Sequence, residues 1–351
     1  MSLINHQNKA FGLDISDGSL RLAQLGNPGK KVSLRAYSQL ALPAGCVIDG
    51  EIKNHKIFLE KLNELIKNKK GRESLSRQVV AVLPEDKTFL KTIKIPSGTA
   101  SISEKIAELI PQQLPLDIND IYFDWQSIKK TPGGESILIG ASPKAIVDSY
   151  FDVLTKAGLT PIALEVEAAS IARLLIEHNN EQEPQIIIDM GASRTGLFLY
   201  DEGMIKFTIS LPISGNQITQ LISESLEMER DKSEKAKIVC GLDRTKCHGA
   251  LLQIMGEALE ELAEQINRAV MFYRANFANA NKIERLVLCG GGANFLGIAD
   301  VLKEKTALNV SVSNPLKNID CPFEELRSVQ IQSFISTLGL ALRGLNLKNY
   351  L

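Results

Sequence analysis

The stretch 186-IIIDMGASRTGLFLY-200 predicts two β-strands joined by a tight turn, because two apolar runs of strand length flank small and polar residues. A similar stretch, 11-FGLDISDGSLRLAQL-25, precedes it by half a chain. Each copy continues through a glycine-containing turn into a third strand, and that of the later copy alternates apolar and polar residues up to Leu211. Two copies of one supersecondary unit predict an internal duplication, with two similar α/β lobes that face each other.

Length and composition are typical of a soluble protein with two domains. The 351 residues exceed one compact core, and 44% of them are apolar and 23% charged. The net charge of −1 argues against a nucleic-acid binder, which usually carries a basic face. The first residues lack the apolar core of a signal peptide, and no apolar run reaches the roughly 20 residues of a membrane span. We therefore expect a cytosolic protein.

The five cysteines fit a reducing compartment, because they are scattered and form no CxxC pair. We expect free, mostly buried thiols. Cys240, Cys247 and His248 lie close in sequence, but their spacing matches no standard zinc site, so a buried thiol and a surface histidine are expected there. No GxSxG or HExxH motif and no nucleophile–base pairing is recognisable.

The pattern of the two lobes is interrupted at 85–156, where short strands and helices alternate around a Pro-Gly-Gly turn. This predicts a compact α+β unit inserted in the first lobe. The first lobe then comprises 1–84 and 157–182. The second lobe comprises 183–351, with a smaller subdomain at about 215–282.

A basic cluster follows the predicted helix of the first lobe; it consists of Lys67, Lys69, Lys70 and Arg72. A solvated loop is the plainer interpretation. Contact with anionic lipid is the alternative, since each such residue can add about 1 kcal/mol of attraction near a membrane.

Three elements can together build one nucleotide site. Asp14 and Asp189 each end a strand, where a carboxylate can face a hydrated Mg²⁺. The small residues that follow let backbone N–H groups approach phosphate oxygens closely. Hydroxyl donors are added by Ser16, Ser19, Ser193 and Thr195. The third element, Gly290 to Gly292, leaves room at a strand end for a base and its ribose.

Each element alone has a plainer interpretation. Asp14 or Asp189 can be a turn-forming residue, and the glycine run can be an ordinary strand–helix turn. All three in this order and at these separations form a far more specific pattern.

With these motifs in this order, the chain resembles the actin-like ATPase superfamily, whose duplicated α/β lobes have an RNase H-like fold. Within it the chain resembles the PilM family of type IV pilus assembly proteins, in the branch shared with FtsA. The stretches that carry the resemblance are 41-ALPAGCVIDGE-51, 110-IPQQLPLD-117, 123-FDWQ-126, 165-EVEAA-169, 211-LPISGNQ-217 and 337-TLGLALR-343. The resemblance covers essentially the whole chain. It implies that the lobes are subdomains 1A and 2A, that 2B lies within the second lobe, and that the insertion is subdomain 1C.

The resemblance also assigns site residues for ATP and Mg²⁺. It places Asp14, Ser16, Ser19 and Arg21 in the first phosphate loop and Asp189, Gly191, Ser193 and Thr195 in the second. Asp14 and Asp189 would hold Mg²⁺ through water, and Gly290, Gly291 and Gly292 match the adenosine motif.

Three further positions follow from the same resemblance. Glu234 and Lys237 match an ExxK pair that contacts adenosine or ribose; their spacing puts both on one helix face, and a solvated ion pair is the alternative. Glu167 matches a residue that positions water for attack on the γ-phosphate, with a helix-start carboxylate as the alternative.

Two residues depart from the family pattern. Ser16 stands where the family usually has Gly, which adds bulk beside the phosphate, and Arg21 stands where it usually has Lys, which changes the reach of the charge. We therefore expect ATP binding and at most slow hydrolysis.

The resemblance implies a cytoplasmic scaffold beneath the inner membrane. Such a protein would bind the N-terminal tail of a PilN-like membrane protein in a groove between 1A and 1C, and would connect to the pilus motor and inner-membrane platform. The alternatives are a small-molecule kinase and an FtsA-like filament. A kinase needs a polar pocket, whereas Ile121, Phe123 and Trp125 in the insertion suggest a peptide surface or a small core. FtsA usually ends in a membrane-binding tail, which is not expected after the last predicted helix here.

Overall fold

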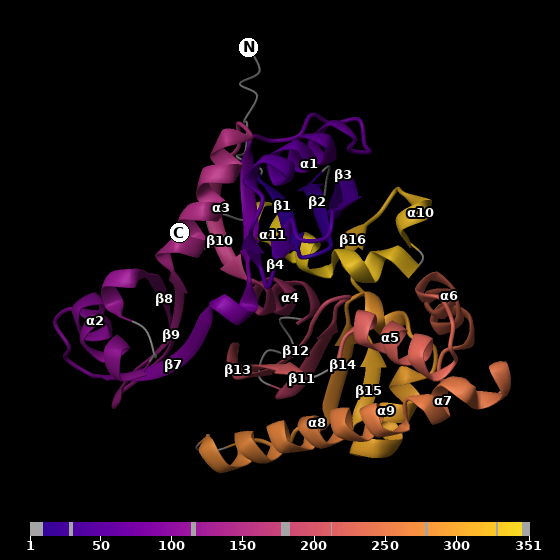
Figure 1. Ribbon diagram of the computed structural model, residues 1–351. Coiled ribbons are helices and arrows are strands. Elements are labelled where there is room, and N and C mark those ends of the chain that lie inside the picture. Colours follow the sequence, from indigo (N-terminus) through magenta and orange to yellow (C-terminus); the bar gives the residue numbers. More distant parts are fainter. Residues whose placement is uncertain are drawn as a thin grey trace. The chain divides into compact units, whose positions relative to one another are not determined.

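The computed structural model describes residues 10–27, 31–113, 117–176, 183–211, 213–277, 280–327 and 329–345. The chain forms two compact units (Figure 1). The first comprises Met1–Leu174, Leu316–Pro322 and Ser336–Leu351, and the second comprises Leu175–Pro315 and Phe323–Ile335.

The first unit contains a six-stranded sheet in the order β10-β6-β1-β2-β3-β16. Its strands are β1 (Phe11–Ser16), β2 (Ser19–Gly26), β3 (Val32–Ala41), β6 (Gln78–Leu83), β10 (Thr160–Val166) and β16 (Ile319–Asp320). The first three form an antiparallel meander, while β6 and β10 run parallel to β1. The carboxyl ends of β1, β6 and β10 therefore lie at one edge of the sheet.

The second unit repeats this plan in the order β13-β12-β11-β14-β15. Its strands are β11 (Gln185–Met190), β12 (Thr195–Asp201), β13 (Met204–Leu211), β14 (Arg285–Cys289) and β15 (Asn309–Val312). Again an antiparallel meander is followed by two strands that run parallel to its first strand. The predicted duplication is confirmed.

Helices cover both sheets, because each helix has an apolar face that packs against the sheet of its unit. In the first unit they are α1 (His55–Lys67), α3 (Lys144–Lys156), α4 (Glu167–Leu175) and α11 (Ile335–Leu345). In the second they are α5 (Gly215–Ser225), α6 (Arg230–Cys240), α7 (Ala250–Ile254), α8 (Gly256–Asn276), α9 (Ile298–Thr306) and α10 (Glu324–Arg327). Asn54, for example, caps α1 by accepting a hydrogen bond from the N–H of Ile57, and α1 buries Phe58, Leu62 and Leu65.

The predicted insertion folds around a small core of its own. Its sheet has the order β7-β9-β8 and packs on α2 (Ile102–Gln113). The strands are β7 (Phe89–Pro96), β8 (Ile121–Thr131) and β9 (Gly134–Pro143). Phe123 and Trp125 pack against this core, which was one of the two roles expected for them. Helix α3, which the prediction assigned to the insertion, instead buries Tyr150 and Leu154 in the core of the main sheet.

The C-terminal helix departs from the predicted boundary of the second lobe. Residues 183–351 were assigned to that lobe, but Leu316–Pro322 and Ser336 onward belong to the first unit. In Figure 1, α11 (yellow) lies beside the indigo strands. The packing is close: a Cβ on Gly339 would lie 1.9 Å from the carbonyl oxygen of Ser170, and one on Gly12 would lie 2.3 Å from that of Thr337.

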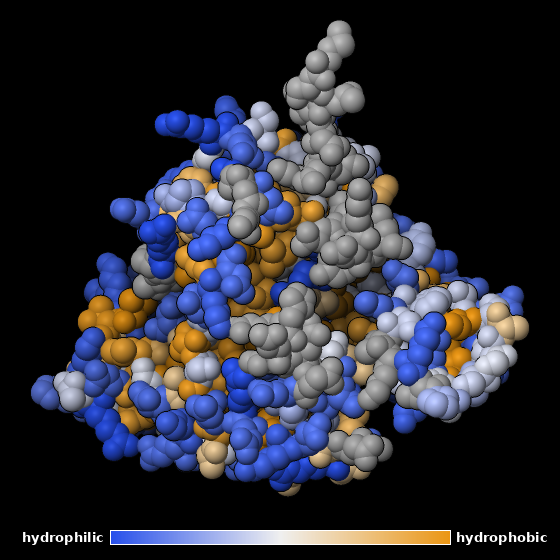
Figure 2. Space-filling model, turned by 180° about the vertical axis from the view of Figure 1, so that it is seen from behind, coloured by the Kyte–Doolittle hydropathy of each residue, from blue (hydrophilic) through white to orange (hydrophobic). Residues whose placement is uncertain are grey.

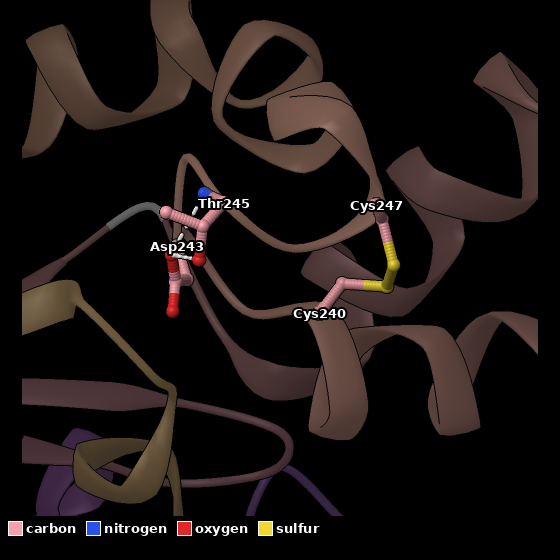
Figure 3. The surroundings of a disulfide bond; sticks show 4 residues. All are labelled: Cys240, Asp243, Thr245 and Cys247. Carbon is pink, nitrogen blue, oxygen red and sulfur yellow. Dashed lines mark hydrogen bonds between the residues drawn. A yellow bond between two sulfur atoms is a disulfide. The ribbon is translucent and has the colours of Figure 1, made fainter.

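The prediction of free thiols is wrong for one pair. Cys240 and Cys247 form a disulfide, with their Cα atoms 5.7 Å apart (Figure 3). Gly241, at φ +56°, turns the chain after α6 and allows the loop to return. Cys46, Cys289 and Cys321 are buried and lie outside this disulfide, as predicted.

The face opposite to that in Figure 1 is mostly hydrophilic, with apolar patches between polar side chains (Figure 2). Among the described helices, none combines the length and apolar character that a bilayer span requires.

The close packing of α11 predicts the effect of a single methyl group. In Gly339→Ala the new Cβ must push α11 away from Ser170, so we expect the free energy of unfolding in urea to fall by about 1–3 kcal/mol. Gly133→Ala is the matched control, because no atom lies within 4 Å of its new Cβ. Equal stability of the two variants would contradict the assignment of α11 to the first unit.

Candidate functional site

The first predicted phosphate loop is a two-residue turn between β1 and β2. Ser16 pairs directly with Ser19. The Ser16 hydroxyl donates to the Ser19 carbonyl oxygen at 3.1 Å, and the two hydroxyl oxygens lie 3.0 Å apart. The two hydroxyl groups that were expected to donate to phosphate are thus already hydrogen-bonded within the turn.

The turn itself is held by Asp17. Its carboxylate accepts hydrogen bonds from the N–H groups of Asp49 and Gly50, at 3.2 and 3.0 Å. These residues connect β4 (Val47–Ile48) and β5 (Glu51–Ile52). Tyr150 donates to the Gly50 carbonyl at 2.7 Å. Burial, and then the charges of Asp17 and Asp14, raise the pKa of Tyr150 well above its ordinary value, so this phenol stays a donor.

Asp14 and Arg21 face each other across the same hairpin. The guanidinium Nη1 lies 3.2 Å from Asp14 Oδ2, and the carboxylate is almost fully buried. Arg21 therefore compensates the negative charge that a metal ion would meet at Asp14. Arg21 supplies the same positive charge as the lysine that the family usually has here, but its guanidinium differs in reach and geometry.

Glu167 is the first residue of α4, directly after β10, and is half-buried. Its carbonyl accepts a hydrogen bond from the Ser170 hydroxyl at 2.7 Å. Because β1 and β10 end at the same edge of the sheet, the structure brings Glu167 and the Ser16–Ser19 turn to one edge of the first unit.

The second predicted loop is tied to the start of α5. The N–H of Gly191 bonds to the Arg194 carbonyl at 2.8 Å and closes the turn. The N–H groups of Gly215 and Asn216, at the start of α5, donate to the carbonyls of Gly191 and Ala192 at 3.0 and 2.8 Å. Hydrogen bonds therefore hold the 191–194 turn and the start of α5 together, and we call this pair of segments the corner.

The side chains of this loop have different surroundings. Ser193 is exposed on the turn, while Thr195 is fully buried at the start of β12. The Thr195 hydroxyl has no hydrogen-bond partner in the described part of the chain. Asp189 is half-buried, and its Oδ1 lies 3.8 Å from the Cys289 sulfur.

The glycine run packs against the end of β11. Gly290 has φ +78°, and a Cβ there would lie 2.2 Å from Asp189 Oδ1. A Cβ on Gly292 would lie 2.7 Å from the Met190 Cβ. Close packing therefore requires glycine at 290 and 292, as expected for an ordinary strand–helix turn. Both lie at the end of β11, where Gly290 approaches Asp189.

Glu234 and Lys237 form part of a network rather than a solvated pair. Lys237 Nζ lies 2.7 Å from Glu234 Oε2, and it also donates to Thr219 Oγ1 at 2.8 Å and to the Gly215 carbonyl at 3.0 Å. Burial would raise the pKa of Glu234, but the hydrogen bonds from Lys237 and Thr219 hold it below its usual value. The pair thus links α6 to the corner at Gly215.

The predicted residues therefore collect in two groups, one in each unit. The first unit holds Asp14, Ser16, Ser19, Arg21 and Glu167. The second holds Asp189, Gly191, Ser193, Thr195, Glu234, Lys237, Gly290, Gly291 and Gly292.

A cavity of about 620 Å³ lies in the first unit between the insertion and the main sheet. One wall is β8, which contributes every residue from Tyr122 to Ser127. Successive side chains of a strand point to opposite faces, so an unbroken run of lining residues means that the edge of β8 borders the cavity. In the order β7-β9-β8, that edge has no strand partner among the described residues.

The opposite wall carries a charged cluster that sequence reasoning missed. Arg173 binds both carboxylate oxygens of Glu165, at 2.6 and 2.9 Å, and Arg343 Nη1 lies 2.5 Å from Glu165 Oε2. Arg173 also donates to the Gly339 carbonyl at 3.0 Å. Glu165 and Arg343 lie in stretches that carried the family resemblance, but their pairing spans 178 positions and has no local signal.

Comparison with known proteins identifies the family. The family model described as type IV pilus assembly protein PilM matches residues 12–345. The cell division protein FtsA of Borreliella burgdorferi is 27% identical over 304 residues, which span 78% of this chain and 68% of that protein. FtsA of Enterococcus hirae is 25% identical over 235 residues, 60% of this chain and 52% of that protein.

Solved structures confirm the predicted actin-like fold. The PilM–PilN type IV pilus biogenesis complex superposes with a TM-score of 0.80 at 23% identity, covering 96% of this chain and 99% of that chain. MreB5 of Spiroplasma citri bound to ADP gives 0.56 at 12% identity, covering 98% and 99%. The ethanolamine utilization protein EutJ of Carboxydothermus hydrogenoformans gives 0.54 at 15% identity, covering 95% and 89%.

The α5–α6 network predicts a local effect of Lys237→Met. This change removes three hydrogen bonds from Nζ, so we expect faster amide exchange at the start of α5 and a loss of about 1–2 kcal/mol in stability. Lys235→Met, on the exposed face of α6, should change stability by less than about 0.5 kcal/mol.

The same network predicts a pH dependence with a definite sign. The folded-state pKa of Glu234 lies below the ordinary 4.5, so its contribution is complete above that pH and is lost as the pH falls through the lowered pKa. Lys237→Met should remove this part of the acid dependence of unfolding. An unchanged pH profile would argue against the network.

Proposed function

Since the chain belongs to the family of type IV pilus assembly protein PilM, we propose that it is a cytoplasmic, ATP-binding scaffold of the pilus assembly complex at the inner membrane. It holds the cytoplasmic N-terminal tail of a PilN-like membrane protein in the cavity of the first unit. The tail keeps the scaffold at the membrane and connects it to the motor and the platform. One structural neighbour is a complex of PilM with PilN, which supports this choice of partner.

The open edge of β8 carries this proposal. A strand edge offers a row of backbone N–H and C=O groups to an extended peptide, which gains main-chain hydrogen bonds and places alternate side chains in pockets. Apolar pockets are available, because Leu83, Leu90, Val147 and Leu164 line the same cavity. Tyr122, at the start of the edge, is 48% exposed and suits an aromatic anchor.

Support for ATP comes mainly from the second unit. Gly191, Ala192 and Ser193 place three small residues in the turn that follows β11, and Lys237 bonds to the Gly215 carbonyl at the start of α5. We assign Gly191 and Ser193 to the phosphates, and Glu234, Lys237 and Gly290 to Gly292 to the adenosine. A neighbour of the same fold, MreB5, is bound to ADP.

The first hairpin is less open to a ligand. Ser16 and Ser19 bond to each other, and Arg21 is paired with Asp14, so phosphate or hydrated Mg²⁺ must compete with contacts already formed. We assign the metal contact to Asp189, because Asp14 is buried and paired with Arg21. A bound Mg²⁺ would neutralise charge on the phosphates. This arrangement suits binding more than fast turnover, so the protein is at most a slow ATPase.

The peptide site is tested with the N-terminal peptide of the PilN-like protein of the same organism, by fluorescence anisotropy. Tyr122→Ala is expected to weaken binding roughly tenfold, the loss typical of an aromatic anchor. Phe151→Ala is the matched control, because Phe151 is an equally exposed aromatic residue (51%) that does not line the cavity. Equal affinities of the two variants would place the peptide elsewhere.

The nucleotide site is tested by calorimetric titration with ATP, with and without Mg²⁺. Binding should depend on Mg²⁺, and Asp189→Asn should weaken it about tenfold or more, since it removes the charge but keeps the size. Asp231→Asn, at an exposed position on α6, should leave it unchanged. Absence of binding at millimolar ATP would mean that the fold is retained without its ligand.

A further inference from the structure

The outer face of α6 exposes two neighbouring aliphatic residues that neither the fold nor the proposed function uses. Ile238 is 66% exposed and Val239 62%, more than any other large apolar side chain in the described residues. Single exposed apolar residues are common on protein surfaces, but an adjacent pair at a helix end points to a surface that is covered in use.

Positive charge surrounds this pair. The segment 230–248 contains six lysines and arginines against three acidic residues, a net charge of +3 in a chain whose net charge is −1. Residues three and four apart are neighbours on a helix, so Lys235 lies beside both Ile238 and Val239, and Lys232 continues the same face. The other side of α6 is occupied, since Ser233 and Cys240 are buried and Lys237 bonds to α5.

The following loop adds two cations and is held in place. The Cys240–Cys247 disulfide ties the end of the loop to the end of α6 (Figure 3). The N–H of Leu242 donates to the Leu296 carbonyl at 2.6 Å. Arg244 and Lys246 lie within this closed loop and are exposed.

The acidic residue of the loop is engaged by its neighbour. Asp243 Oδ1 accepts hydrogen bonds from the backbone N–H and the hydroxyl of Thr245, at 2.8 and 2.7 Å, and these bonds lower the pKa of Asp243 (Figure 3). The ion pair between Arg244 and Glu304 is 3.7 Å long, with both side chains about three-quarters exposed, so it holds Arg244 only weakly.

We propose that this surface, formed by Lys232, Lys235, Ile238, Val239, Arg244 and Lys246, docks on an anionic lipid bilayer. The lysines and arginines are attracted to lipid phosphates, and the two aliphatic side chains enter the headgroup boundary. An acidic protein surface would also match the cations, and a failure to bind anionic vesicles would favour it over lipid. With only two apolar side chains the contact is weak and reversible, so it supplements another tether.

The basic cluster after α1 is less suited to this role. Lys69 Nζ donates to the Gly71 carbonyl at 3.2 Å, and Lys70 lies 5.6 Å from the centre of the Tyr37 ring. The segment 67–72 contains no large apolar side chain that could enter a bilayer. The solvated-loop interpretation therefore fits that cluster.

Co-sedimentation of the purified chain with vesicles tests the charge component. We expect binding to phosphatidylcholine–phosphatidylglycerol vesicles, little binding to phosphatidylcholine alone, and release by salt. The double variant Lys235→Gln/Lys246→Gln should bind roughly 30-fold more weakly, about fivefold for each lost charge. The control Lys156→Gln/Lys282→Gln removes the same charge from exposed lysines elsewhere and should bind as the unmodified protein does.

Tryptophan emission tests which surface touches the lipid. Val239→Trp should show a blue shift on addition of anionic vesicles, whereas Phe151→Trp, at an exposed position in the other unit, should not. No binding to anionic vesicles, equal binding of the two lysine double variants, or no shift in Val239→Trp would each overturn the proposal. Neither readout depends on ATP or on the peptide.

Discussion

The contact between Gly339 and Ser170 is the constraint on which the cavity of the first unit depends. A Cβ on Gly339 would lie 1.9 Å from the Ser170 carbonyl, so α11 and α4 meet backbone to backbone. This approach lets Arg173 on α4 reach the Gly339 carbonyl and brings Arg343 to Glu165. Removing one partner of such a buried ionic cluster typically costs about 3–5 kcal/mol, because an unpaired charge is left inside. The absence of a side chain at Gly339 thus stabilises the part of the cavity wall formed by Glu165, Arg173 and Arg343.

The β1–β2 and β11–β12 hairpins differ in their polar contacts, although their sheets have the same strand arrangement. In the first, Ser16 bonds to Ser19 and Arg21 pairs with Asp14, so these two contacts stay within the hairpin. In the second, the polar contacts run outward from Gly191 to α5, and from there through Lys237 to α6. These hydrogen bonds hold the Gly191 turn, the start of α5 and α6 together, which suits the nucleotide binding proposed above.

Local patterns in the sequence were sufficient for the architecture. The two hairpins, the alternation toward Leu211 and the change of pattern at 85–156 are short-range signals, and the structure follows them, except that α3 packs on the main sheet. Contacts between distant segments left no such signal. The return of α11 to the first unit depends on Gly339 and Ser170 fitting together. Of the candidate site, the residue types were predictable, whereas the Glu165 cluster and the mutual bonding of Ser16 and Ser19 required the fold.

The central claim is that a peptide from a membrane partner pairs with the open edge of β8. Hydrogen–deuterium exchange of the full chain, with and without the N-terminal peptide of the PilN-like protein, tests it most directly. The peptide is expected to slow the exchange of alternate amides between Tyr122 and Ser127, because only every second N–H of a strand points toward one edge. Peptide binding that leaves β8 exchange unchanged, or protects only another surface, would contradict it.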